Sequence, residues 1–276
     1  MAEKVSVESY KYDTLQVSSP IPYLLIVKMV SKGNLMNFQM WKEMSACFNQ
    51  ASNDETVRVV ILSGAGDTFT NGLDLEEAAA ALAPKPGHDA ARSGFKIYDI
   101  VGIAQECTNA IEKCVKPVIA AVNGACYGGG LDVITACDIR LCVADAVFAV
   151  KELDVAIAQD MGTLQRLPKV VANDSLVREL CFTGRDFTSS EALACGLVSK
   201  VSKDSDALWE EALQMAELIA KKSPIGVQGS KVNLNFSRNH SIPDGLAFNR
   251  AWNAVMLQTE DIGKAAASPD ATFTNI

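Results

Sequence analysis

The sequence predicts an α/β fold in which mostly parallel strands are covered by helices. Three features indicate it: short apolar runs rich in β-forming residues, helical periodicity between these runs, and glycines where the runs end. The runs 23–30 and 58–64 have the composition of buried strands, and 37–50 between them has apolar residues at helical spacing. The first part of the chain is therefore predicted to be a strand–helix–strand unit.

The same alternation continues further along the chain. A helical pattern covers 94–114, and it is followed by an apolar strand at 117–123, a short helix at 129–137 and another strand at 139–143. Before them, the segment 78–92 combines an alanine run with prolines and a glycine. That composition breaks regular structure and is typical of a mobile flap.

Strand signals weaken after residue 182, and three helical patterns follow at 190–195, 207–222 and 247–267. Two regions are therefore predicted: an α/β core with the active site at 1–187, and a helical C-terminal region at 188–276. Apolar helices appended to an α/β core commonly pack against another copy of the chain, so the second region is expected to form oligomers.

Composition excludes several classes of protein. The chain has 276 residues, of which 49% are hydrophobic and 21% charged, which is ordinary globular material. Its formal net charge is -8 and no basic patch is visible, so we expect no nucleic-acid partner. No apolar run is long enough for a membrane span.

The eight cysteines include several in apolar segments, which favours buried free thiols over a disulfide framework. The two histidines, His88 and His240, are far apart in turn-like contexts, and no metal site is expected. The N-terminus lacks a signal or transit pattern, and the chain ends in Thr274-Asn275-Ile276, which is not a peroxisomal Ser-Lys-Leu address. The compartment stays open on the sequence.

Two glycine-marked segments directly follow predicted strands. Gly128-Gly129-Gly130 opens a helix, and Asn71-Gly72-Leu73 follows the strand 58–64. Backbone N–H groups of Gly129 and Leu73 that point to one place would form an oxyanion hole. The alternatives are close helix–strand packing for the first segment and a surface turn for the second. Neither segment has the spacing of a phosphate loop or of a dinucleotide-binding loop.

Three carboxylates, Asp132, Glu152 and Asp160, lie among apolar and small residues close to the first glycine segment. Acids that share an apolar cleft repel each other and have raised pKa values, which suits proton transfer. Each has a simpler explanation: a helix-dipole partner for Asp132, an ion pair with Lys151 for Glu152, and a helix N-cap for Asp160. Together they form the candidate catalytic set.

Four segments resemble the enoyl-CoA hydratase/isomerase (crotonase) family over roughly residues 15 to 265. They are 34–37 (NLMN), 69–75 (FTNGLDL), 117–124 (PVIAAVNG) and the Gly128-Gly129-Gly130 helix start. Within the family, segments 130–140, 150–155 and 160–169 are similar to the Δ3,5-Δ2,4-dienoyl-CoA isomerase branch. The hydratases of the family carry glutamate where Asp132 stands and glycine where Asp160 stands, whereas these isomerases carry aspartate at both positions.

The resemblance implies a crotonase-like spiral of ββα units with a C-terminal helical oligomerisation region that forms a homo-trimer or hexamer. It implies isomerisation of 3,5-dienoyl-CoA to 2,4-dienoyl-CoA in fatty acid β-oxidation. The thioester oxygen would lie between the N–H groups of Leu73 and Gly129, with Glu152 serving C2, Asp160 serving C6 and Asp132 tuning both.

The resemblance also bears on cofactors, location and alternative activities. No cofactor is needed, because CoA is part of the acyl-CoA thioester substrate. Mitochondrion or peroxisome is the implied location. Two alternatives remain open: an enoyl-CoA hydratase, in which Asp132 and Glu152 hold a water, and a non-catalytic RNA-binding oligomer of the same fold. Against hydration, Asp132 is one methylene shorter than glutamate, and a displacement near 1 Å costs about 100-fold in rate.

Overall fold

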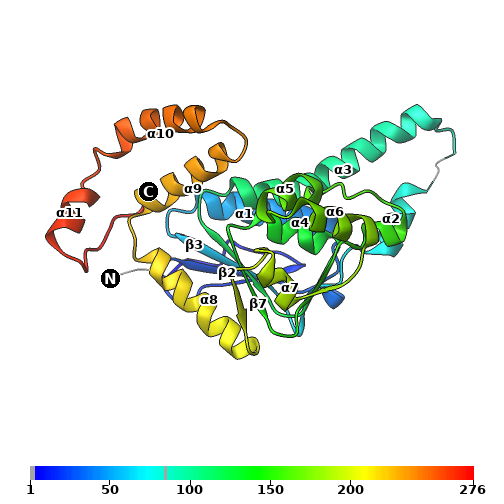
Figure 1. Ribbon diagram of the computed structural model, residues 1–276, viewed down its shortest axis with the longest axis horizontal. Coiled ribbons are helices and arrows are strands. Elements are labelled where there is room, and N and C mark those ends of the chain that lie inside the picture. Colours follow the sequence, from blue (N-terminus) through cyan, green and yellow to red (C-terminus); the bar gives the residue numbers. More distant parts are fainter. Residues whose placement is uncertain (1–3, 84–85) are drawn as a thin grey trace.

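A computed structural model describes residues 4–83 and 86–276 of the chain (Figure 1). Its main sheet has six strands in the order β1-β2-β3-β5-β7-β10, and all neighbours except β1 and β2 are parallel. The strands are β1 (Leu15–Ser18), β2 (Leu24–Met29), β3 (Val59–Gly64), β5 (Val118–Val122), β7 (Ile139–Val143) and β10 (Lys200–Ser202). Every residue of β3 and β5 is buried, as their continuous apolar runs predict.

A second sheet of four short strands explains the spiral. Its order is β4 (Thr68–Thr70), β6 (Ala125–Tyr127), β8 (Val147–Ala149) and β9 (Phe187–Thr188). In the chain, β4 comes after the main-sheet strand β3, β6 after β5, and β8 after β7. The chain therefore repeatedly adds one strand to each sheet before a helix, and the predicted α/β fold of ββα units is confirmed.

Helices cover both faces of the main sheet. The helices α1 (Phe38–Asn53) and α3 (Ala90–Lys113) pack against each other, and α3 also packs against α4 (Gly129–Ala136). On the opposite side of the sheet, α8 (Ser205–Ala220) packs against β2, β3, β5 and β7 (Figure 1). The predicted helices and strands of the core thus lie within a few residues of their expected bounds.

Four further helices belong to the core (Figure 1). They are α2 (Leu75–Leu82), α5 (Thr163–Val170), α6 (Asp174–Thr183) and α7 (Ser189–Ala194), with short 3-10 turns at η1 (Lys32–Asn34) and η2 (Lys151–Val155). The predicted flap 78–92 includes the end of α2 and the start of α3. Its residues Pro84 and Lys85 lie outside the described residues, as do residues 1–3. Its mobility stays a prediction.

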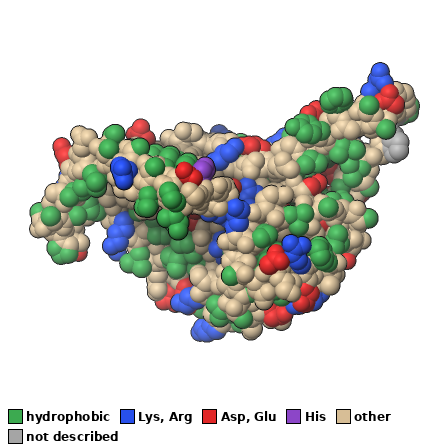
Figure 2. Space-filling model, turned by 45° about the horizontal axis from the view of Figure 1, so that its top comes forward, with side chains coloured by type: hydrophobic (Ala, Val, Ile, Leu, Met, Phe, Trp, Pro, Cys, Tyr) green, Lys and Arg blue, Asp and Glu red, His purple; other side chains and the backbone are tan. Residues whose placement is uncertain are grey.

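The C-terminal helices α9 (Pro224–Ser237), α10 (Ile242–Met256) and α11 (Asp261–Ala267) form an arm that extends away from the sheets (Figure 1). We call residues 224–267 the C-terminal arm. Figure 2 shows apolar side chains gathered on it. Ile242 is 81% exposed, and Leu234, Leu246, Val255 and Leu257 are also exposed. Although both follow residue 187, β10 and α8 belong to the layers of the core.

Arg58 ties the chain end back to the core. Its guanidinium donates hydrogen bonds to the carbonyl of Ala220 at 2.9 Å, the carbonyl of Phe273 at 2.5 Å and the side chain of Asn275 at 2.7 Å. The chain segments before and after the C-terminal arm are therefore held at one buried arginine.

All eight cysteines are free, and all but Cys195 are buried, as predicted. Among the described residues, no helix has the length and apolar character that crossing a bilayer requires.

Candidate active site

The glycine segment 128–130 lets α4 begin directly against its neighbours. Gly128 has φ 51°, a conformation that favours glycine, and its N–H donates to the carbonyl of Ala149 at 2.9 Å. A Cβ on Gly129 would lie 2.8 Å from the Met36 sulfur, and one on Gly130 would lie 2.6 Å from a methyl carbon of Thr70. Close packing therefore explains Gly130, which is the alternative given above for this segment. Gly129 is the first residue of α4 and has its N–H at the helix start.

Leu73 is held by a short parallel bridge to Met36. The Met36 N–H donates to the Gly72 carbonyl at 2.8 Å, and the Asp74 N–H donates to the Met36 carbonyl at 3.0 Å. In such a ladder the N–H of the intervening residue points away from the partner strand. Within the described residues, neither the Leu73 N–H nor the Gly129 N–H donates a hydrogen bond. Both residues line one cavity of about 240 Å³.

Glu152 lines the same cavity and lies on η2, directly after β8 and Val150. Its Oε2 is buried and has no hydrogen-bond partner within the described residues. Burial, followed by the charge of Asp160, raises the pKa of Glu152 to about 7. The alternative of an ion pair with Lys151 is wrong, since the Lys151 ammonium contacts Asp186 at 2.8 Å and Asp154 at 3.6 Å.

Asp160 lies on the wall of this cavity beside Glu152, at a position that keeps contact with solvent. Partial loss of water around the carboxyl raises its pKa. The N-cap of α5 is Gly162, so the alternative role of Asp160 as this cap is wrong. Two acids with raised pKa values therefore share one cavity with two unpaired backbone donors.

Asp132 lies behind the cavity and is only 1% exposed. Its carboxylate accepts the N–H of Thr163, the first residue of α5, at 2.5 Å. Burial, followed by the charge of Glu152, raises the pKa of Asp132 to about 7. The structure thus brings Glu152 and Asp160 together in the cavity wall, while Asp132 can act on them only through its charge and its bond to α5.

Asp132 gives stability a specific pH dependence. Because its pKa is about 7 when folded and 3.8 in the reference state, the folded protein binds more protons between these values. Its contribution to stability is then present at low pH and is lost as pH rises through about 7. We expect the stability of Asp132→Asn relative to wild type to increase as pH rises from about 4 to about 7 and to stay constant above that. Chemical denaturation of both proteins measures this, and a pH-independent difference would contradict the raised pKa.

The loop that carries Asp160 is anchored by polar residues of α3 that the sequence patterns did not reveal. The Gln105 amide donates to the Asp160 carbonyl at 2.8 Å, and the Thr108 hydroxyl donates to the Met161 carbonyl at 2.7 Å. Arg166 of α5 pairs with Glu112 of α3 at 2.9 Å. In the sequence, Arg166 was the one hint of this anchor. Its partner Glu112 could not be inferred, because it is more than fifty residues away in the chain.

The rest of the cavity wall is mostly apolar and comes from the start of α1, from α2 and α3, and from the loop after η2. Its apolar side chains are Met36, Phe38, Trp41, Leu73, Ala78, Ala81, Leu82, Ile97, Ile100, Val101, Ala104, Ile157 and Met161. The cavity therefore combines a polar end with the paired acids and an apolar lining suited to a hydrocarbon chain.

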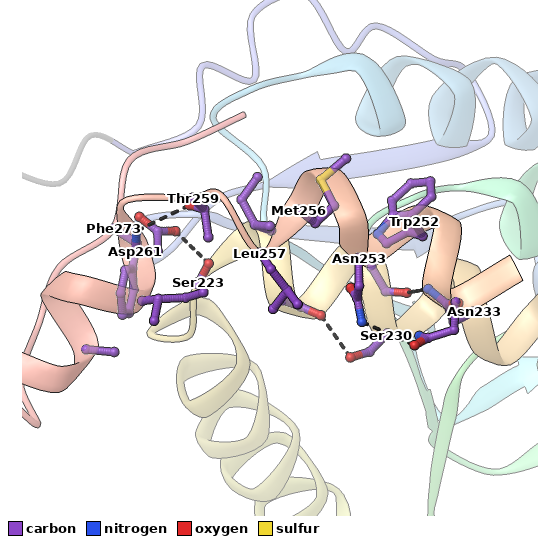
Figure 3. A pocket seen from close by; sticks show the side chains of 16 residues that line it. Ser223, Ser230, Asn233, Trp252, Asn253, Met256, Leu257, Thr259, Asp261 and Phe273 are labelled. Atoms are coloured by element: carbon purple, nitrogen blue, oxygen red, sulfur yellow. Dashed lines mark hydrogen bonds between the residues drawn. The ribbon is translucent and has the colours of Figure 1, made fainter. Parts of the chain in front are cut away.

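A second cavity, of about 370 Å³, lies between α9, α10 and α11 (Figure 3). Asn233, Trp252 and Asn253 face it, and the Ser223 hydroxyl donates to Asp261 at 2.6 Å (Figure 3). None of the three candidate acids lines it. The candidate acids Glu152 and Asp160 therefore make the cavity beside α2 and α3 the candidate active site.

Residues 24–268 match the family model described as enoyl-CoA hydratase/isomerase. The chain belongs to this family. One member, the mitochondrial Delta(3,5)-Delta(2,4)-dienoyl-CoA isomerase of Pongo abelii, is 49% identical over 258 residues, which cover 93% of this chain and 79% of that protein. The peroxisomal enzyme of the same name from Arabidopsis thaliana is 39% identical and is covered to 96%, as is this chain.

A solved structure of the family has the same fold. The enoyl-CoA hydratase from Bacillus anthracis superposes with a TM-score of 0.84 at 27% identity, covering 96% of this chain and 98% of that one. The family resemblance expected from the sequence is thereby confirmed.

Proposed function

We propose that this protein isomerises 3,5-dienoyl-CoA to 2,4-dienoyl-CoA in fatty acid β-oxidation. The observation that carries the proposal is the pairing of Glu152 and Asp160 in the wall of one largely apolar cavity that also contains Leu73 and Gly129. Identity of 49% to a protein named as this isomerase supports it. A double-bond shift over several carbons needs two acid/base groups spaced along the acyl chain, and this cavity offers two.

In the proposed mechanism, the thioester oxygen accepts the N–H groups of Leu73 and Gly129. The Glu152 carboxylate removes a proton from C2, and the electron pair delocalises onto the thioester oxygen and along the chain to C6. Loss of one backbone N–H donor to the thioester oxygen typically costs about 3 kcal/mol of transition-state stabilisation. The protonated Asp160 then donates to C6, which leaves double bonds at C2 and C4.

The active ionisation state therefore has Glu152 ionised and Asp160 protonated. Burial raises the pKa of both carboxyls, and two acids in one cavity favour a singly protonated pair. The proposed mechanism requires that this proton lies on Asp160 when the substrate binds. After turnover the proton lies on Glu152, and exchange with solvent restores the starting state. Asp132, buried behind the pair, is assigned the role of tuning the two acids from the start of α5, where its carboxylate accepts the Thr163 N–H.

The direct test is the growth of conjugated-diene absorbance when the protein is mixed with a 3,5-dienoyl-CoA. We expect rapid conversion, and only weak hydration of a 2-enoyl-CoA. Fast hydration without isomerisation would instead identify an enoyl-CoA hydratase. The named locations of the two relatives, mitochondrial and peroxisomal, make either compartment our proposal for this chain.

We further propose that the C-terminal arm joins copies of the chain into a trimer or hexamer, because its exposed apolar side chains would be covered there. We expect Leu246→Asp to dissociate the oligomer, since a charge in an apolar contact is strongly unfavourable. Leu218→Asp on α8 is the matched control, because Leu218 and Leu246 are both 63% exposed. Light scattering measures the mass, and equal effects of both changes would contradict a contact specific to the arm.

A further inference from the structure

Glu77 is a carboxylate in the wall of the active-site cavity that the proton shift does not use. It lies in the first turn of α2, immediately after the segment that contains Leu73. No residue of α2 is buried, so packing alone does little to fix where this helix begins. Polar contacts must therefore hold the start of α2 and the backbone before it.

The side chain of Glu77 reaches across to the start of α1. Its Oε2 accepts the N–H of Phe38, the first residue of α1, at 2.9 Å. This N–H is one of the donors that a helix start leaves unpaired. The neighbouring Asn37 side chain accepts the N–H of Met40, so each of these two acceptors serves a different donor of α1.

Glu77 is also fixed within α2, because its own N–H donates to the Asp74 side chain at 3.1 Å. Together with the bridge between Met36 and Leu73, three backbone N–H groups now join the two segments. They are Met36 N–H to the Gly72 carbonyl, Asp74 N–H to the Met36 carbonyl and Phe38 N–H to Glu77. Leu73 lies inside this set of contacts, between Gly72 and Asp74.

We propose that Glu77 is a positioning residue that aims the Leu73 N–H at the thioester oxygen by tying α2 to α1. The inference rests on the proposed function. Because α1 packs against α3 in the core, its first turn is fixed and can support the Leu73 side of the oxyanion hole. The contact needs an acceptor oxygen at this distance from the backbone, and it does not need a negative charge.

The first test uses ligand binding, which does not depend on turnover. A saturated acyl-CoA thioester has the carbonyl oxygen that the hole binds, whereas the matched S-alkyl-CoA thioether lacks it. We expect wild type to prefer the thioester and Glu77→Ala to lose about tenfold of this preference. Glu77→Gln should retain the preference, since its amide oxygen can accept the Phe38 N–H.

Two further variants make the test specific. Glu76→Ala is the matched control, because Glu76 is an exposed acid in the same turn of α2 and should leave the preference unchanged. Glu77→Asp keeps the charge but is one methylene shorter, so it should behave like Glu77→Ala even if the latter folds poorly. In the isomerase assay we expect kcat to fall about 10- to 100-fold in Glu77→Ala, with a smaller change in KM.

The outcomes separate the two proposals. A thioester preference that survives in both Glu77→Ala and Glu77→Asp overturns the positioning role while leaving the proposed function intact. Loss of activity in Glu77→Gln as severe as in Glu77→Ala also overturns it, because the charge or proton would then be what matters. Absence of the preference in wild type overturns the Leu73 donor itself, and with it the proposed mechanism.

Discussion

Glu152→Gln is expected to lower kcat for the 3,5-dienoyl-CoA shift by about 10³-fold, within the range for losing a general base. Glutamine has the same shape but cannot take the C2 proton at any accessible pH. The thioester should still bind, because Leu73 and Gly129 contribute backbone groups that the change leaves in place. The measurement is kcat by diene absorbance together with Kd for the product.

Asp154→Asn is the matched control for this change, since Asp154 lies on the same 3-10 turn but its carboxylate contacts Lys151 at the surface. It should retain nearly full activity. If the Glu152→Gln protein kept wild-type activity, Glu152 could not be the base that removes the C2 proton. A variant that fails to bind the product would instead indicate that Glu152 shapes the pocket.

Asp160→Asn is expected to lower the rate of product formation by a comparable factor, about 10²- to 10⁴-fold, but for a different reason. Asparagine cannot donate the proton that C6 requires, although the dienolate can still form at Glu152. The anchor of this loop is made by the Asp160 carbonyl and Gln105, so the backbone should hold its position. Activity is measured with the same diene assay.

The change from Asp160 to asparagine has a second consequence, which concerns the pH dependence. Asparagine cannot ionise, so proton exchange at C2 in the variant should keep its plateau at high pH, whereas wild-type turnover should fall there as Asp160 loses its proton. Asp174→Asn, an exposed acid on α6, serves as control and should change neither property. Unaltered product formation in Asp160→Asn would contradict its role at C6.

The core of the fold could be predicted because its signals are local. The continuous apolar runs of β3 and β5 and the glycine entry to α4 each mark an element without reference to the rest of the chain. The very short strands of the second sheet could not be predicted, since two or three residues carry no periodicity and depend on pairing with distant partners. The helix α9 was missed because Gly226 and Gly229 weaken its helical pattern.

The sequence indicated the residues of the candidate site, but not which of them line the cavity and which lie behind it. Leu73, Gly129, Glu152 and Asp160 line one cavity, whereas Asp132 lies behind it. An acid in the first turn of a helix has the same sequence pattern whether its side chain faces a pocket or a neighbouring helix. The Thr163 N–H that binds the Asp132 carboxylate is thirty-one residues away in the chain. The contact between Glu77 and Phe38 spans thirty-nine residues and has no sequence signature.

If separate acids serve the two ends of one delocalised anion, deuterium exchange should distinguish Glu152 from Asp160. In D2O, Asp160→Asn should incorporate deuterium at C2 of the unreacted 3,5-dienoyl-CoA while forming almost no 2,4-dienoyl product, whereas Glu152→Gln should incorporate none. Exchange at C2 in Glu152→Gln, together with its loss in Asp160→Asn, would contradict this division of labour between the two carboxylates.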